Sequence, residues 1–503
     1  CHDYDGGRVW YTAGGHTSES FAEPLFLAHL LGGIEYAAGI RPGDGGATIE
    51  NNFQKVVLDS GLTAPMQLAV ATDGRVFYIL RSGQVRVYRP QTSSAAALGQ
   101  ISVYTGDEDG LLGVALDPGF ATNNWLYLFY STTTNSQQNL SRFTVAGETL
   151  DSASEKLILT VPTQRGGVNH AAGALAFGPD GNLYLATGDN TNPFSSDGYA
   201  PLDERVGRER YDAQRSAGNA NDLRGKILRL RPQPGGSYTI PAGNLFPVDG
   251  SGGRPEIHIM GCRNPFRISL DPENGWLYWG DVGPDSHTAS VTRGPLGYDE
   301  INQARGAGNF GWPYFSADNK PYVGYNFSTS QSGAAFNPNA PVNNSPNNTG
   351  PVSLPPARPA MIWYAYDSIP EFPEMGQGTY RTAMAGPVYQ YRANLVSNRQ
   401  FPRYYDKTLF FVDWARSRMY EAKLDSSGTL LKINPFLPSL RNGLSVFNQP
   451  ISMAFGPDGA LYYLEYNNGT LSRIDYGAGN QAPAASALAT PASGSVPLAV
   501  QFS

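Results

Sequence analysis

The chain has 503 residues, and its 58 Gly and 38 Pro make up nearly one fifth of it, whereas only 16% of the residues are charged. Gly supplies positive φ and Pro presets φ in tight turns, so this composition argues against long helices, coiled coils and charged disordered tails. The formal charge of −7 gives no basic footprint for nucleic acid, and no stretch approaches the roughly 18–20 apolar residues of a membrane span. We therefore expect a β-dominated protein without a nucleic-acid partner or a membrane span.

Residues 1–48 begin the chain with a Gly-rich stretch, followed by one segment with a helical pattern at 18–31 and a turn-rich run at 41–46. They are too few, and too poor in apolar residues, to form a domain by themselves. We interpret them as the C-terminal remnant of a domain.

Residues 49–478 contain a recurring unit, in which a short apolar strand, an Asp-Gly or Asp-Pro turn and a second alternating strand follow one another. A degenerate sixth copy runs through 401–424. Hairpins repeated in this way are typical of radially arranged blades, so we predict an all-β, six-bladed propeller with short partial flanking segments; a β-sandwich is the alternative. The five clear copies are 65–78, 112–128, 173–185, 265–278 and 450–463.

Two segments depart from this pattern. Residues 318–380 break the pattern, and within them 326–359 are dense in Asn, Pro, Ser and Gly and are predicted to form a long loop or lid between blades. Residues 479–503 are rich in Ala, Pro and Ser before they become strand-like, so we interpret them as a linker and the first strand of another module.

Residues that bind soft metals are scarce. Cys1 and Cys262 are the two cysteines, which is too few for a disulfide framework or a four-thiolate site, although one bridge between them stays open. None of the six histidines has an i, i+4 partner, so a zinc enzyme is not expected.

One histidine stands at a strand entrance. His170 follows a Gly-rich turn and precedes the first strand of a predicted blade, where propellers line their central channel. Asp189 ends the same hairpin, so a carboxylate returns to the channel rim where it could orient the imidazole. A lone His is more often structural, and that alternative is kept.

Further polar residues cluster at predicted strand ends. Arg263 and Asn264 precede an inner strand, where they would face the channel or form a surface salt bridge. Loops around 281–285 and 298–302 offer the carbonyls and carboxylates that calcium prefers, although loop acids are usually only solvated. Arg416 and Arg418 stand two residues apart, and arginines that converge on a channel suit a small, multiply anionic ligand.

Five motifs in one order resemble the soluble pyrroloquinoline-quinone (PQQ)-dependent sugar dehydrogenases, the glucose/sorbosone dehydrogenase family, over about residues 55–476. Residues 1–39 are similar to the end of a trehalose-utilisation (ThuA-like) domain, and the segment from Asn480 is similar to the start of a polycystic-kidney-disease (PKD) module. The five motifs are EDGLLGVALDPGF (108–120), NHAAG (169–173), LRGKILR (223–229), GCRNP (261–265) and DEIN…GNFGWP (299–313).

The resemblance implies an oxidoreductase that converts an aldose to its lactone and passes electrons through PQQ to an external acceptor such as a cytochrome or dye. His170 would then be the general base and Asp189 its orienting partner, while Arg263 and Asn264 would hold the quinone oxygens. Such architectures suggest a secreted or periplasmic protein that handles carbohydrate.

The same resemblance implies that a calcium ion anchors PQQ. The carbonyls of Gly283 and Pro284 would bind the ion, near the carboxylates of Asp299 and Glu300. Arg416 and Arg418 would pair with the carboxylates of PQQ.

Three positions differ from the glucose-oxidising members of the family. Glu108 stands where a Gln is found, and we expect it to pair with an Arg or to bind metal. Arg392 stands where the Lys that contacts PQQ is found, in a chain with 29 Arg and 7 Lys. Residues 285–298 form an insert after the expected calcium loop.

Two other functions remain open from the sequence. The first is a calcium-dependent hydrolytic propeller such as a lactonase, which would not need converging arginines. The second is a non-catalytic sugar-binding propeller. One fold hosts many functions, so the fold cannot separate these alternatives.

Overall fold

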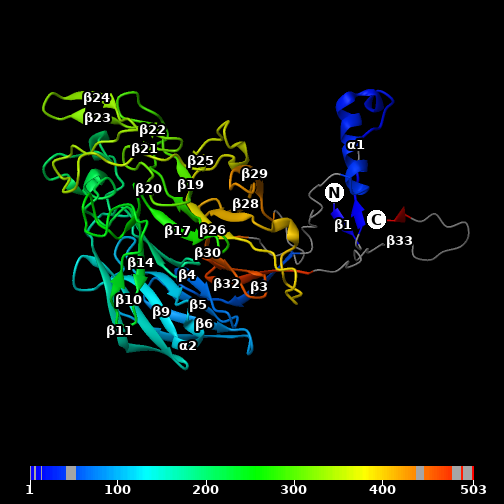
Figure 1. Ribbon diagram of the computed structural model, residues 1–503, viewed down its shortest axis with the longest axis horizontal. Coiled ribbons are helices and arrows are strands. Elements are labelled where there is room, and N and C mark those ends of the chain that lie inside the picture. Colours follow the sequence, from blue (N-terminus) through cyan, green and yellow to red (C-terminus); the bar gives the residue numbers. More distant parts are fainter. Residues whose placement is uncertain are drawn as a thin grey trace, which may run out of the picture.

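The structure is a computed structural model that describes residues 2–4, 7–12, 14–40, 53–437, 447–477, 489–490 and 501–502. Six sheets of at least four strands, all antiparallel except for one parallel pair in the third, form the predicted six-bladed propeller. The inner strands of neighbouring blades contact one another in a closed ring, β4–β8–β12–β17–β26–β30 and back to β4. Figure 1 shows β4, β17, β26 and β30 close together near the middle, with β11 and the β23–β24 hairpin at the periphery.

The first three blades run from the inner to the outer strand in chain order. Their strands are β4 (Pro65–Val70), β5 (Val76–Leu80), β6 (Gln84–Arg89) and β7 (Ser94–Gln100); β8 (Leu111–Leu116), β9 (Trp125–Ser131), β10 (Gln137–Ala146) and β11 (Thr149–Pro162); and β12 (Ala172–Phe177), β13 (Leu183–Thr187), β14 (Lys226–Pro232) and β16 (Ile257–Met260), with β15 (Tyr238–Thr239) and β20 (Gly308–Asn309) added to the third.

The other three blades complete the ring, and the sixth takes its outer strand from the start of the propeller. The first strand of the propeller, β3, pairs with its last strand, β32, so one sheet contains both ends of the propeller and closes the ring. The strands are β17 (Pro265–Leu270), β18 (Leu277–Asp281), β19 (Asp299–Ala304) and β25 (Ile362–Tyr364); β26 (Ala383–Val388), β27 (Leu409–Asp413), β28 (Arg418–Leu424) and β29 (Leu430–Pro435); and β30 (Pro450–Phe455), β31 (Leu461–Glu465), β32 (Thr470–Tyr476) and β3 (Phe53–Asp59).

The hairpin turns explain the repeated Asp-Gly pairs. In the third blade, Gly181 has φ +73°, a conformation that L side chains rarely adopt, and the Asp180 carboxylate accepts a hydrogen bond from the Asn182 N–H at 3.1 Å. Gly459 has φ +78° at the same place in the sixth blade. These turns lie at the end of the propeller opposite the starts of the inner strands.

The sequence analysis expected the segment 318–380 to lie between blades, and this expectation is wrong. It lies largely within the fourth blade, between β19 and the outer strand β25, and carries short two-stranded hairpins. The three residues of β25 are too short a strand to show a sequence pattern, which is why the insertion was misplaced. The hairpins are β21 (Phe315–Ser316) with β22 (Lys320–Pro321), and β23 (Val323–Asn326) with β24 (Gln331–Ala335).

The N-terminal segment contains α1 (Pro24–Ala37) preceded by a 3-10 turn (Ser20–Ala22) and the paired strands β1 (His2–Tyr4) and β2 (Gly7–Val9). The helix starts and ends six residues later than the predicted segment 18–31, because Pro24 occupies its first turn, where a missing N–H does no harm. Near the other end of the chain, β33 (Ala489–Thr490) pairs with β34 (Gln501–Phe502), and most of 479–503 lies outside the described residues.

Short helical turns complete the described secondary structure. They are α2 (Phe120–Asn123) and the 3-10 turns Ser196–Gly198, Glu209–Tyr211, Ala213–Arg215, Pro373–Met375 and Arg403–Tyr405.

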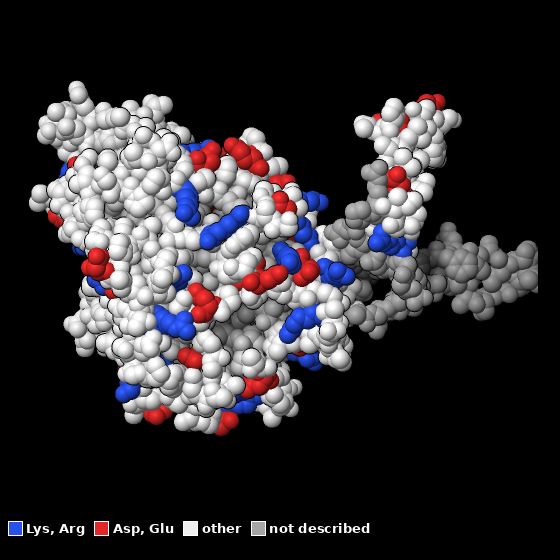
Figure 2. All heavy atoms as spheres, in the orientation of Figure 1, with Lys and Arg blue, Asp and Glu red and all other residues white. Residues whose placement is uncertain are grey.

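The surface carries charges of both signs. On the face shown in Figure 2, Lys and Arg side chains alternate with Asp and Glu side chains rather than forming a patch of one sign. Within the described residues, no helix is both long and apolar enough to cross a membrane.

Candidate active site

The backbone around His170 is strained and is held by one carboxylate. His170 has φ +63° and Ala172 has φ +48°, both in the left-handed region. Such residues cost of the order of 1–3 kcal/mol each and persist only where their surroundings fix them. The Glu108 Oε2 atom accepts hydrogen bonds from the N–H groups of His170 at 2.7 Å and Ala171 at 3.1 Å. Glu108 therefore holds the backbone of the histidine loop; among the described residues it forms no ion pair with an Arg, and the expected metal role stays a prediction.

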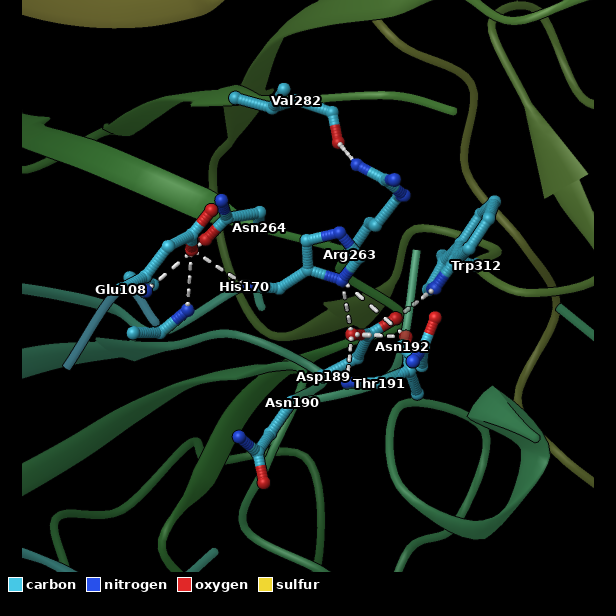
Figure 3. A network of polar contacts seen from close by, with 12 residues as sticks. Glu108, His170, Asp189, Asn190, Thr191, Asn192, Arg263, Asn264, Val282 and Trp312 are labelled. Carbon is cyan, nitrogen blue, oxygen red and sulfur yellow. Dashed lines mark hydrogen bonds and ion pairs between the residues drawn. The ribbon is translucent and has the colours of Figure 1, made fainter. Parts of the chain in front are cut away.

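The imidazole of His170 is buried and bonded to Asp189. His170 is 4% exposed and Asp189 is fully buried, and the Nδ1 atom lies 2.7 Å from Asp189 Oδ1. The two residues meet because Gly188 has no side chain; a Cβ there would lie 1.8 Å from the His170 carbonyl oxygen. The sequence predicted this pairing, and Figure 3 shows His170 between Glu108 and Asp189.

Asp189 is further fixed by three hydrogen bonds from two other side chains and the backbone. Trp312 Nε1 donates to Oδ2 at 2.8 Å, while the Thr191 hydroxyl and N–H donate to Oδ1 at 2.8 and 3.0 Å. Burial alone would raise the pKa of Asp189. The charge and the hydrogen bond of His170 outweigh the effect of burial, with further help from Arg263 and Trp312, and they hold the pKa of Asp189 below its usual range. Asp189 is therefore a carboxylate at neutral pH.

Arg263 and Asn264 lie beside the histidine loop. Their backbone N–H groups donate to the Asp281 carboxylate, with Asn264 N at 2.6 Å. The Asn264 side-chain oxygen accepts from the Ala172 N–H at 3.1 Å. The Arg263 guanidinium donates to the Val282 carbonyl at 2.7 Å and lies over the Trp312 ring.

Two cavities open at this end of the propeller. One of ≈ 260 Å³ lies where the inner strands begin. The second, of ≈ 620 Å³, is bounded by His170, Arg263 and Trp312 and by the segments 191–201 and 284–295. The first cavity is lined by Met66, Arg81, Glu108, Asn264, Phe266, Val282, Thr382, Met384, Trp414, Ile451 and Tyr466.

The expected calcium ligands divide into two groups. Gly283, Pro284 and Glu300 line a small cavity of ≈ 10 Å³ together with Asp281 and Ser316. Asp299 is engaged elsewhere: its carboxylate forms a buried ion pair with Arg381 and accepts the N–H groups of Gly283 and Ala383. Arg381 also donates to the Pro284 carbonyl. Across the described residues, no three His, Cys, Asp or Glu side chains converge as a metal cluster.

The small cavity holds two buried acids that face each other. Asp281 and Glu300 are register partners on β18 and β19. Burial raises the pKa of Asp281 to about 7, and burial together with the charge of Asp281 raises the pKa of Glu300 to about 8. The hydroxyl of Ser316 is buried beside them without a hydrogen-bond partner.

Three predicted arginines do not reach the candidate site. Arg416 donates to the carbonyls of Ala365 at 2.7 Å, Met375 at 3.0 Å and Tyr380 at 3.0 Å. Arg418 is exposed. It is the first residue of β28, whereas Arg416 lies in the turn before that strand. The two residues are therefore not on one strand, and strand alternation does not place their side chains on one face.

Arg392 lies at the opposite end of the propeller. Its guanidinium donates to the carbonyls of Gly456 and Pro457, in the turn after the inner strand β30. A cavity of ≈ 550 Å³ there is lined by turn residues of three blades. The structure therefore does not bring the Arg392 and Arg416 side chains together with His170, because both are bonded to carbonyls elsewhere, and the predicted cofactor roles of Arg392, Arg416 and Arg418 stay predictions.

Sequence reasoning missed several residues at the site. Arg81 lines the ≈ 260 Å³ cavity and directly follows β5, a place equivalent to that of Gly188 after β13, one residue before Asp189, so the repeat itself could have indicated it. Trp312 belongs to the GNFGWP motif but was given no role. The cavity residues Trp414 and Tyr466 directly follow the second strands β27 and β31, at the same place in the repeat as Arg81, so the repeat could have indicated them as well.

The fold and site define a six-bladed propeller with a His–Asp pair at one mouth of its channel. The family model described as glucose/sorbosone dehydrogenase matches residues 62–374, so the chain belongs to this family. A separate family model, trehalose utilisation, matches residues 1–37, in agreement with the predicted similarity of residues 1–39 to a ThuA-like domain. The predicted PKD module stays a prediction.

Named relatives and solved structures agree with this membership. The quinoprotein glucose dehydrogenase B of Acinetobacter calcoaceticus is 24% identical over 456 residues, which span 84% of this chain and 87% of that protein. The aldose sugar dehydrogenase YliI of Escherichia coli is 29% identical over 264 residues, which span 51% of this chain and 61% of that protein. A PQQ-bound aldose sugar dehydrogenase structure from Streptomyces coelicolor has a TM-score of 0.54 at 18% identity, covering 84% of this chain and 98% of that one, which supports the shared fold.

Proposed function

We propose that this protein is a PQQ-dependent sugar dehydrogenase that oxidises an aldose at its anomeric carbon to the lactone and passes the electrons to an external acceptor, in a secreted or periplasmic setting. The observation that carries the proposal is the buried His170–Asp189 pair at the wall of a cavity. Family membership and the names of the relatives support PQQ as the electron acceptor.

The ≈ 260 Å³ cavity fits a flat, anionic cofactor. Trp414, Tyr466 and Met384 supply apolar walls, while Arg81 supplies positive charge and Asn264 an amide. Arg263 adds a second guanidinium from the neighbouring cavity. These residues would hold PQQ, and Arg81 takes the charge-pairing role that the sequence analysis gave to Arg416 and Arg418. When bound, PQQ supplies the two-electron acceptor for the hydride that leaves the sugar.

His170 is oriented to take the proton from the sugar. Its Nδ1 atom is bonded to the Asp189 carboxylate, so Nδ1 carries the hydrogen and Nε2 presents a lone pair. The anomeric hydroxyl would give its proton to Nε2 as the C1–H bond breaks and the C1–O bond becomes a carbonyl. Asp189 would stabilise the imidazolium that results, because it stays charged.

Arg263 would stabilise negative charge as it develops during oxidation. Its guanidinium is held by the Val282 carbonyl and the face of Trp312, so little reorganisation is needed when the charge appears.

The residues around the ≈ 10 Å³ cavity fit calcium better than the set expected from the sequence. Asp281, Glu300 and Ser316 present hard oxygen atoms, and the Ser316 hydroxyl has no other partner. Asp299 is not included because Arg381 already neutralises it. A bound divalent cation would supply positive charge near Arg263 and would favour the ionised form of both acids.

The proposal is tested by reconstitution of the purified chain with PQQ, with and without Ca²⁺, followed by dye reduction with a panel of aldoses. We expect PQQ to bind and to be bleached by sugar, and we expect Ca²⁺ to raise the thermal midpoint. His170→Ala should abolish turnover and leave PQQ affinity within a few-fold, because His170 does not line the ≈ 260 Å³ cavity. Hydrolysis of lactones without PQQ binding would instead support the lactonase alternative, and sugar binding without turnover the binding module. Full activity of His170→Ala would refute the mechanism.

A further inference from the structure

Polar side chains bond the inner strands of different blades to one another. Each inner strand is the edge of its sheet, so the backbone groups on its free side need other partners. Gln67 donates to the Leu175 carbonyl at 2.8 Å and accepts the N–H groups of Val114 and Leu175, both at 3.1 Å. The hydroxyls of Ser269 and Ser452 likewise bond to backbone groups of neighbouring inner strands. Neutral amides and hydroxyls are therefore sufficient to tie inner strands together.

Arg267 does the same with a charged group. It is the third residue of β17 and is 3% exposed. Its Nε atom donates to the Ile451 carbonyl at 2.8 Å, and its two terminal nitrogens donate to the carbonyls of Phe266 at 2.7 Å and Met66 at 2.5 Å. These carbonyls belong to the second residues of β30, β17 and β4. One guanidinium thus joins the sixth, fourth and first blades.

The same three carbonyls belong to residues that line the ≈ 260 Å³ cavity, to which the proposed function assigns PQQ. Arg267 does not line this cavity, so its guanidinium lies behind the wall that the three residues form. Arg81 and Glu108 are the charged residues of the lining, and Glu108 is engaged by the histidine loop. The charge of Arg267 acts on the cavity from behind, through a buried medium that screens charge far less than water does.

The charge of Arg267 has no counter-ion. Among the residues that the structure describes, no Asp or Glu side chain forms an ion pair with it; its hydrogen bonds go to backbone carbonyls. Burial lowers the pKa of Arg267 to about 9, so the guanidinium is still charged at neutral pH. Buried charges in proteins are usually paired with a charge of opposite sign. An anion in the cavity would complete this pairing.

We propose that Arg267 is a positioning residue, whose charge makes the cavity select a flat anion over a neutral molecule of the same shape. It acts through the wall of the cavity and does not touch the occupant. The identity of that occupant as PQQ rests on the proposed function, and the three carboxylates of PQQ would supply the missing negative charge. A neutral side chain at this place would tie the strands, as Gln67 does, but would not make the selection.

The test measures, by calorimetry on the full chain, the affinities for PQQ and for its uncharged trimethyl ester. We expect Arg267→Gln to bind PQQ at least tenfold more weakly and the ester within about twofold of wild type, whereas Arg267→Lys keeps most of the preference because a cation remains. The ratio of the two affinities is unaffected by any loss of folded protein. Arg142→Gln is the matched control: Arg142 is also buried and donates to two carbonyls, those of Gln233 and Pro234, but lies in the third strand of the second blade. Its substitution should leave the ratio unchanged.

A second pair of probes separates failure of this proposal from failure of the proposed function. Naphthalene-2,6-dicarboxylate is a flat anion unrelated to redox chemistry, and its dimethyl ester is the neutral counterpart. If PQQ does not bind but the dicarboxylate binds better than its ester, and this preference is lost in Arg267→Gln, the role of Arg267 holds while the proposed function fails. The proposal is overturned if Arg267→Gln weakens acid and ester equally, if Arg267→Lys loses as much preference as Arg267→Gln, or if wild type binds neither flat anion.

Discussion

Asp189→Asn is the substitution that probes the proposed mechanism most directly. It preserves the shape of the side chain but removes its charge and one acceptor oxygen. In the native site Oδ1 accepts from His170 and Thr191, and Oδ2 accepts from Trp312. An asparagine amide can accept on one side only. Its NH₂ group must therefore face either the Trp312 N–H or the Nδ1 atom of His170.

Both orientations damage the site. If the NH₂ group faces Trp312, it meets the Trp312 N–H, and two buried donors then lack an acceptor. If it faces His170, Nδ1 must become the acceptor. Nε2 then carries the hydrogen and has no lone pair for the proton of the sugar. A hydrogen bond to a charged group contributes about 1.5–3 kcal/mol, and an unsatisfied buried donor costs about 1–3 kcal/mol. Losing roughly 3–4 kcal/mol of transition-state stabilisation corresponds to a fall in kcat of about 10²–10³-fold.

Steady-state dye reduction by the PQQ-loaded variant measures this fall, and a titration of PQQ measures cofactor affinity. PQQ affinity should stay within about threefold, because Asp189 lines neither cavity. Asp413→Asn is the matched control: Asp413 ends β27, is fully buried, accepts the Thr382 N–H and pairs with a cation, Arg416 at 3.2 Å, but it has no hydrogen bond to a histidine. A variant Asp189→Asn with more than one tenth of the wild-type kcat, or with kcat and PQQ affinity lost in parallel, would refute the reasoning.

Two further substitutions test the loop and the core. Glu108→Ala leaves the N–H groups of His170 and Ala171 without their acceptor. We expect the unfolding free energy to fall by about 2–4 kcal/mol and kcat to fall by more than tenfold, and we expect Glu108→Gln to be milder in both measurements. Equal effects of the Ala and Gln variants would contradict this role. Burial, helped by the charge of Arg229, lowers the pKa of His258 from 6.5 to about 3. Between pH 3 and pH 6.5 the unfolded state therefore binds more protons at this residue than the folded state does. His258 thus makes the unfolding free energy rise with pH in this range, by up to about 1.4 kcal/mol per pH unit. Urea unfolding at pH 4–7 should show a shallower rise in His258→Gln but not in the exposed control His29→Gln, and parallel curves for wild type and His258→Gln would count against the assignment.

The sequence predicted the propeller because its blades repeat a local pattern. Asp180 and Gly181, like Asp458 and Gly459, place turn-forming residues between two apolar strands, and local turn chemistry does not depend on distant contacts. The fourth blade was harder because its outer strand has three residues and follows 57 residues of insertion, as numbered from β19 to β25. A strand of that length owes its place to its neighbours, which no window of sequence contains.

The candidate site was predictable only where chemistry and position coincide. Second strands end in a buried acid at several blades: Asp281, Asp413 and Glu465 each pair with the first residue of their inner strand, the place that Thr187 takes in the third blade, two residues before Asp189. Each of these three acids accepts a backbone N–H from the segment that enters an inner strand. This is a structural device, so a carboxylate there does not by itself indicate catalysis. What distinguishes Asp189 is that Gly188 lets the chain approach His170 closely enough for the pair to form. Arg416 differs for the converse reason: its guanidinium pairs with Asp413 at 3.2 Å and donates to carbonyls from segments far away in sequence. A catalytic prediction from strand ends therefore needs two coinciding signals, a titratable partner and a residue small enough to let it approach.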